Sequence, residues 1–156
     1  MRWLAVLLVA TASFVVVPRS LFGLAGAPAP RRAEWLPWLA VGLFVVSWRL
    51  PNPHLAHTNS FVRHAVGGGA ACAVVGLFLA TNAGLQSRAL RIGLAYAVAA
   101  VMGVAVELAE LAAFEFLGVI QGDDTAWDLL ANTCGALATA VLLELVVRPR
   151  RLAVAA

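Results

Sequence analysis

Five apolar runs dominate the chain and leave few ways for it to fold. They predict membrane spans at residues 3–17, 35–50, 63–81, 90–117 and 127–147. A helix that crosses a bilayer needs about 20 mostly apolar residues. The first two runs are shorter and reach that length only with their flanking residues. We therefore predict one all-α transmembrane domain over residues 1–156, a polytopic bundle of about five helices.

The composition excludes most other classes of protein. The chain is 62% hydrophobic and 12% charged, whereas soluble domains are about 25% charged. One small soluble core cannot bury so much apolar surface. Cys72 and Cys134 both lie inside apolar runs, so a disulfide framework is not supported. The basic residues lie at the ends of the apolar runs, which is typical of topology signals, and we expect no nucleic-acid partner.

The arginines predict how the bundle is oriented. With five spans, the side that holds the N-terminus has three arginines and the opposite side has eight. Basic residues accumulate on the cytoplasmic side, which places the N-terminus outside and the C-terminus in the cytoplasm. The first run also has features of a signal peptide, with Arg2 before it and Ala25–Ala27 as a cleavage site. The sequence leaves its cleavage open.

The acidic residues and histidines, whose side chains are energetically unfavourable inside a membrane, are concentrated in two short regions. Six of the eight acidic residues lie between positions 107 and 128, and all three histidines lie between positions 54 and 64. The predicted topology brings both groups to the outer face. An ionisable side chain inside a membrane is a functional-site hypothesis by default. The candidate ligand-binding residues are Arg63, His64, Glu107, Glu110, Asp124, Asp128 and Asn132.

The chemistry of this cluster stays open at the level of sequence. Glu107 and Glu110 share a helix face and would repel each other if both were ionised, so one should hold a proton or Arg63 should lie close. Catalytic residues are unknown, with these two glutamates as candidates. A purely structural polar network is the main alternative to a function, and the functional alternatives are recognition of a polar head group, acid–base catalysis and ion or proton passage. No cofactor and no metal are predicted. His54 and His57 would be the candidate ligands of a metal, but their spacing matches no metal signature.

Small residues recur at four-residue steps in the last three spans. They follow His64 at Gly68, Cys72, Gly76 and Ala80; they precede Glu107 at Ala95, Ala99 and Gly103; and they follow Asp128 and Asn132 at Ala136 and Ala140. Such steps let helices approach closely in lipid, so we expect these spans to pack together. Gly67–Gly69 is interpreted as part of that packing. Glu144 is expected to form an interfacial ion pair with Arg148, and Glu34 to be a solvated charge.

Three motifs resemble a known family. They are His54–His57 (HLAH), Glu107–Glu110 (ELAE) and Asp124–Ala136 (DTAWDLLANTCGA). In these motifs the chain resembles the VanZ-like family of bacterial integral membrane proteins and, more weakly, the YjdF-type membrane proteins. Glu107, Asp128, Asn132 and Gly135 match the family pattern, whereas Glu110 stands where a glutamine is usual. The resemblance implies a multi-pass protein of the bacterial cytoplasmic membrane with a cell-envelope role linked to glycopeptide antibiotic resistance, and no established reaction.

The leading functional hypothesis is recognition of a lipid-linked or cell-wall polar group in an outward-facing pocket. Arg63 would meet an anionic group, Glu107 and Glu110 would accept hydrogen bonds or move a proton, and Asp128 and Asn132 would set the geometry. The expected partner is a membrane lipid or lipid-linked envelope precursor, with an oligomer or a membrane-protein partner also possible. The alternatives are an enzyme acting on an envelope lipid through Glu107, Glu110 or a His-bound metal, and a small structural subunit of a membrane complex.

Overall fold

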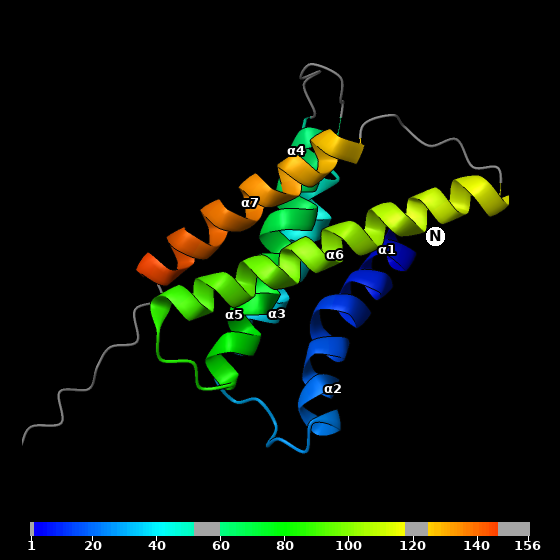
Figure 1. Cartoon of the computed structure of the whole chain (residues 1–156). Helices are drawn as coiled ribbons and strands as arrows, with labels where there is room; N and C mark the ends of the chain where they lie inside the picture. The colour runs from blue at the N-terminus through cyan, green and yellow to red at the C-terminus, as the bar shows by residue number, and fades with distance from the viewer. Residues whose placement is uncertain (1, 52–59, 118–124, 147–156) are drawn as a thin grey trace, which may run out of the picture.

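The structure, a computed structural model, describes residues 2–51, 60–117 and 125–146 (Figure 1). These ranges contain helices and no strand. In chain order the elements are α1 (Arg2–Thr11), the π-helix η1 (Ala12–Val16), α2 (Val17–Leu24), α3 (Trp35–Ser47), α4 (Phe61–Arg63), the π-helix η2 (His64–Ala70), α5 (Ala71–Asn82), α6 (Arg88–Leu117) and α7 (Thr125–Val146). The all-α class expected from the apolar runs is confirmed.

Four helical segments in the described ranges are long and apolar enough to cross a membrane. They are Trp3–Leu24, Phe61–Asn82, Arg88–Ala112 and Thr125–Val146. A fifth apolar helix, Trp35–Ser47, is shorter at 13 residues. Large apolar side chains remain exposed along α1, α6 and α7, as expected of surfaces that face lipid rather than water. The helices therefore have the length and surface of a membrane protein.

The first helix continues past its predicted end. The apolar run was predicted to end at residue 17, and it is followed by Pro18, which lacks an N–H and whose ring crowds the carbonyl of Phe14. Instead, η1 widens the backbone to π-helical hydrogen bonding just before Pro18, and the proline lies in the first turn of α2. A π-turn of this kind accommodates a residue that the regular hydrogen-bond ladder cannot. The helix consequently runs on to Leu24.

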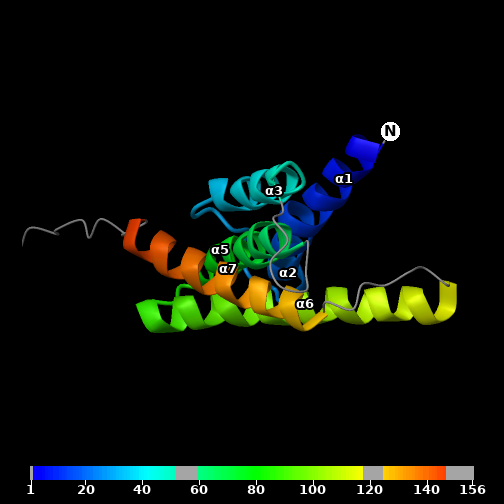
Figure 2. The same cartoon turned by 90° about the horizontal axis from the view of Figure 1, so that it is seen from above.

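α5 is the central helix of the bundle. Every residue from Ala71 to Phe78 is buried, and α3 covers one side of α5 while α6 and α7 cover the other (Figure 2). The apolar composition of α5 on all faces fits this position, because a helix that is hydrophobic all round is buried.

Taken as the segments α1–α2, α3, α4–α5, α6 and α7, the helices run in alternating directions along the chain (Figure 1). At one end of the bundle the Arg49 guanidinium, just after α3, lies 4.3 Å from the ring centre of Trp3 in α1. At the other end the Asn82 side chain accepts hydrogen bonds from the backbone N–H groups of Arg31 and Arg32 at 3.1 and 2.9 Å. These contacts fix the connection before α3 beside the end of α5.

Glycines let the last three long segments approach closely, as the four-residue steps predict. A Cβ atom on Gly76 would lie 2.5 Å from the Cα of Ala95 in α6, and one on Gly69 would overlap the α7 backbone at Asn132. Ala95 and Ala136 are fully buried at these contacts. The close packing of the third, fourth and fifth segments is therefore confirmed.

Glu144 has a partner that the sequence did not indicate. Glu144 in α7 is buried, and its Oε1 accepts a hydrogen bond from Nε of Arg91 in α6 at 2.8 Å. Arg148 lies outside the described residues. The physical reason is that α7 turns this face toward α6, where a buried carboxylate needs a partner inside the bundle. Glu34 is exposed, with an Arg19 nitrogen at 3.8 Å.

The glycine contacts predict a difference between two identical substitutions. Gly76→Ala places a methyl group against Ala95, and we expect it to lower the free energy of unfolding by about 1–3 kcal/mol through overpacking. Gly93→Ala lies on α6, where an added Cβ meets nothing within 4 Å, so it should be neutral or stabilising by up to about 1 kcal/mol. Thermal unfolding in detergent measures both, and equal effects would refute the packing argument.

Candidate functional site

The candidate site is positioned by the contact between η2 and α7. Both segments present glycines at this contact: a Cβ on Gly135 would run into the carbonyl of Ala65, and one on Gly69 would run into the α7 backbone. With no side chains between them, the two backbones lie side by side. The polar residues just before these glycines, His64 on η2 and Asp128 on α7, are thereby brought together.

The imidazole of His64 lies against the buried carboxylate of Asp128. The His64 Nδ1 lies 2.9 Å from the Asp128 Oδ1, and the Asp128 side chain is only 5% exposed. Ser60 donates a hydrogen bond from its Oγ to the same Oδ1 at 2.6 Å. A charged acceptor makes this a strong hydrogen bond. Ser60 therefore holds the carboxylate in place beside the imidazole.

Glu107 on α6 adds a second buried carboxylate to the same place. Its side chain lies beside Thr125 at the start of α7, and its Oε1 is buried with no hydrogen-bond partner in the described part of the chain. One ligand atom from each of His64, Glu107 and Asp128 lies within 4.8 Å of the others. We call these three residues the carboxylate–histidine cluster; one comes from η2, one from α6 and one from α7.

Asn132 lies one helical turn beyond Asp128 and is held between two glycines. A Cβ on Gly103 of α6 would lie 3.1 Å from its Nδ2, and a Cβ on Gly68 of η2 would overlap its Oδ1. The side chain is buried. The small residues therefore have a second effect besides close helix packing. Here Gly68 and Gly103 leave the space that the polar side chain of Asn132 occupies.

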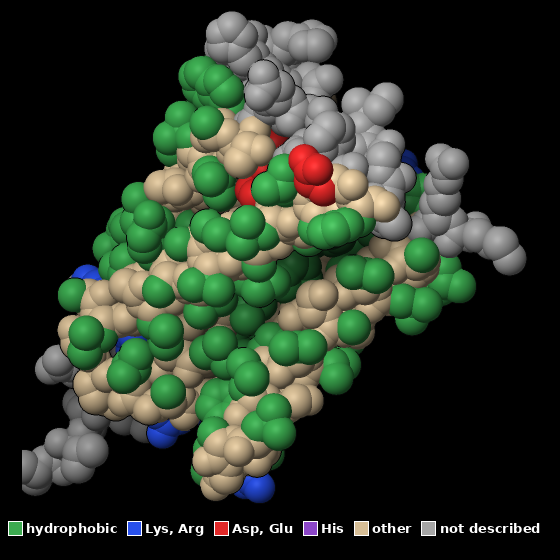
Figure 3. All heavy atoms as spheres, turned by 45° about the vertical axis from the view of Figure 1, so that its right-hand side comes forward, with side chains coloured by type: hydrophobic (Ala, Val, Ile, Leu, Met, Phe, Trp, Pro, Cys, Tyr) green, Lys and Arg blue, Asp and Glu red, His purple; other side chains and the backbone are tan. Residues whose placement is uncertain are grey.

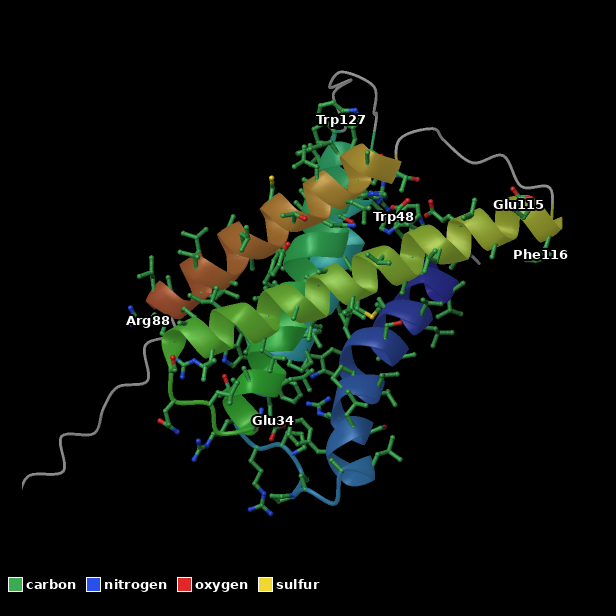
Figure 4. The ribbon with its side chains drawn as sticks, viewed as in Figure 1. Glu34, Trp48, Arg88, Glu115, Phe116 and Trp127 are labelled. Atoms are coloured by element: carbon green, nitrogen blue, oxygen red, sulfur yellow. The ribbon has the colours of Figure 1, made fainter. Side chains whose placement is uncertain are left out.

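A cavity of about 380 Å³ lies next to the cluster, between α1, α3, η2, α6 and α7. Its wall is mostly apolar, with Val9, Phe14, Phe44, Met102 and Val106 among the lining residues. Its polar lining is Ser13, Ser47, Arg63, His64, Glu110 and Asn132. The Arg63 guanidinium lies 4.8 Å from the ring centre of Trp48, which marks this end of the bundle in Figure 4. Cavities of about 300–1,000 Å³ with a few placed polar groups are typical of ligand sites.

The predicted site residues fall into three groups. Arg63, His64, Glu110 and Asn132 line the cavity, and His64 also belongs to the carboxylate–histidine cluster with Glu107 and Asp128. Asp124, His54 and His57 lie outside the described residues. Glu110 is exposed, whereas Glu107 is 6% exposed, so the two glutamates of the ELAE motif have different surroundings.

Sequence reasoning missed Ser60 and Thr125. Each is one helical turn before a residue that it did select, Ser60 before His64 and Thr125 before Asp128. Hydroxyl side chains at that spacing are the signal that would have found them, since residues three or four apart share a helix face. Together they place a hydroxyl group beside each of the two buried carboxylates of the cluster.

No family model, curated protein or solved structure matches this chain. The resemblance to the VanZ-like family therefore rests on the sequence motifs alone and stays a prediction.

The hydrogen bond to Asp128 predicts unequal effects of two serine substitutions. Ser60→Ala removes a donor from a buried carboxylate, and we expect a loss of about 1.5–3 kcal/mol in the free energy of unfolding. Ser20→Ala removes an exposed hydroxyl that bonds to the carbonyl of Val16, which should change the stability by less than about 0.5 kcal/mol. Thermal unfolding of both variants in the same detergent makes the comparison, and a silent Ser60→Ala would contradict it.

Proposed function

We propose that the chain is a VanZ-like cell-envelope protein of the bacterial cytoplasmic membrane, and that its cavity binds the polar group of a lipid-linked or cell-wall molecule. One observation carries the proposal: the cavity joins a long apolar wall to a polar lining that includes Arg63 and Asn132. A fully water-soluble ligand would have no use for the apolar wall. An amphipathic ligand uses both.

The lining suggests how such a ligand would lie. The apolar part of the ligand packs on Phe14, Phe44 and Val106, which line the wall. Arg63 meets an anionic group, phosphate or carboxylate, for which its planar guanidinium is suited. A volume of about 380 Å³ suits a head group with the first part of a chain, so the rest of a lipid would extend into the bilayer.

We further propose five crossings with the N-terminus outside. The alternating helix directions support an odd number of crossings if α3 is counted. α3 spans about 20 Å at 1.5 Å per residue, so Trp48, Arg49 and Leu50 have to contribute to its crossing. In Figure 3 acidic side chains gather near one end of the face shown, and arginines lie mainly toward the other. Arg31, Arg32 and Arg88 are exposed at the latter end, which positive-inside counting assigns to the cytoplasm.

Single-cysteine labelling tests this orientation. In a chain with Cys72→Ala and Cys134→Ser, we expect Pro51→Cys to react with a membrane-impermeant maleimide on intact spheroplasts. Gln86→Cys, exposed in the connection between α5 and α6, should react only after the membrane is opened. The reverse pattern would overturn the orientation and place the cavity near the cytoplasmic side.

Native mass spectrometry of the detergent-solubilised protein tests ligand binding. We expect the wild-type chain to carry a co-purified envelope lipid or lipid-linked precursor. Arg63→Gln should lose most of it by removing the charge that meets the anionic group, and Val106→Trp should lose it by filling the cavity.

Two matched variants control for general damage. Val101→Trp adds the same bulk on α6 at a residue that is 68% exposed and does not line the cavity. Arg88→Gln removes a charge from the opposite end of α6, as Figure 4 shows. Both should keep the ligand. A wild-type chain with no bound amphiphile, or equal losses in Val106→Trp and Val101→Trp, would refute the proposal.

One observation favours a second candidate, an enzyme that acts on an envelope lipid. Glu107 presents a buried oxygen with no hydrogen-bond partner in the described ranges, close to His64 and Asp128, and a carboxylate so placed can act as a general base. For this candidate, Glu107→Gln keeps the bound lipid but abolishes its conversion. Conversion that persists in Glu107→Gln excludes this role for Glu107.

A further inference from the structure

We infer that His64, Glu107 and Asp128 form a binding site for a divalent metal ion of the zinc or manganese type. The inference goes beyond the proposed recognition of a lipid, because Glu107 and Asp128 are not among the residues that line the cavity. It also concerns different residues from His54 and His57, the metal candidates of the sequence.

The first argument is the number and spacing of the ligand atoms. One nitrogen or oxygen atom from each of the three residues lies within 4.8 Å of the other two. Zinc bonds of about 2.0–2.2 Å would space such atoms roughly 3.4 Å apart in a tetrahedral shell. The His64 Nδ1 and the Asp128 Oδ1 are 2.9 Å apart, so these two atoms would move slightly apart and Glu107 would move toward them, by side-chain adjustments.

The second argument is that the facing atoms do not satisfy one another. The His64 Nδ1 is close to the Asp128 Oδ1 but is not aligned to hydrogen bond with it, and the Glu107 Oε1 has no hydrogen-bond partner in the described ranges. The Glu107 side chain is 94% buried. Buried polar atoms are nearly always paired. A cation that accepts a lone pair from each atom supplies the missing partner.

The third argument is charge. Among the described residues, the charged side chains that act on Glu107 are the carboxylates of Glu110 and Asp128 and the imidazole of His64. Buried carboxylates repel each other and are costly in a membrane segment. A divalent cation at the cluster would offset the charge of the buried Glu107 carboxylate.

The hydroxyl groups around the cluster fit the same role. Ser60 donates a hydrogen bond to the Asp128 carboxylate and Thr125 lies beside that of Glu107, as the outer residues of metal sites typically orient their ligands. The set of one imidazole and two carboxylates, with no thiolate, favours zinc, manganese or iron over copper(I). Cys72 and Cys134 are not part of the cluster.

Metal binding to the full chain tests the inference directly. The protein is purified with a tag that contains no histidine, stripped with a chelator and dialysed against Zn²⁺ or Mn²⁺, and its metal content is measured by elemental analysis. We expect about one ion per chain and a metal-dependent rise in the unfolding temperature, because a ligand that binds only the folded state stabilises it.

Variants locate the ion. Glu107→Gln and Asp128→Asn keep the side-chain volume and should weaken metal binding at least about tenfold. Glu115→Gln, an exposed glutamate at the far end of the same helix (Figure 4), and Cys134→Ser should bind as the wild type does. If a cluster variant fails to fold, wild-type protein loaded with Co²⁺ keeps the test decisive, because its visible spectrum should show nitrogen and oxygen ligands without thiolate bands.

Three results would overturn the inference. They are a wild-type chain with no bound ion and no shift in unfolding temperature, undiminished binding in Glu107→Gln, and thiolate bands with Co²⁺. None of them bears on the lipid proposal, whose readout is the co-purified amphiphile. Glu107→Gln leaves the lining of the cavity intact, so loss of the metal with retention of the lipid would separate the two sites.

Discussion

The approach of two backbones, η2 and α7, is the contact on which the rest of this end of the bundle depends. Gly69 and Gly135 leave no side chain between the segments, and small residues are what permit such approach in lipid, where no hydrophobic force between helices compensates for poor packing. His64 and Asp128 come within 2.9 Å as a consequence. A bulkier contact would separate them and open the cluster.

The same contact explains why the polar residues are buried without being exposed to lipid. Asn132 occupies space left by Gly68 and Gly103, and Glu107 reaches the start of α7 at Thr125. Each polar side chain is therefore enclosed by backbone rather than by acyl chains. The large apolar side chains lie on the outer faces of α1, α6 and α7. The bundle is thus arranged with its polar groups inside, the reverse of a soluble protein.

Sequence periodicity predicted the helices and their close packing, because both depend on local spacing: apolar runs of sufficient length and small residues at four-residue steps. It also selected His64, Glu107 and Asp128, since charge inside an apolar run is visible without coordinates. It did not predict that Glu144 pairs with Arg91, because the rotation of α7 against α6 decides that partner. The π-helical turn before Pro18 was missed because the first run was taken to end at residue 17, and no local pattern records the one at His64–Ala70.

The two buried acidic sites of the bundle solve the same electrostatic problem in different ways. Glu144 faces Arg91, a permanent cation that donates one hydrogen bond to each of the two carboxylate oxygens. Such a pair needs no further ion to balance its charge. Glu107 instead lies beside His64 and Asp128, and its buried Oε1 has no hydrogen-bond partner among the described residues. A purely structural role would be served better by the first arrangement. The second leaves a lone pair of the buried Glu107 carboxylate available, which is what a site that binds an exchangeable cation requires.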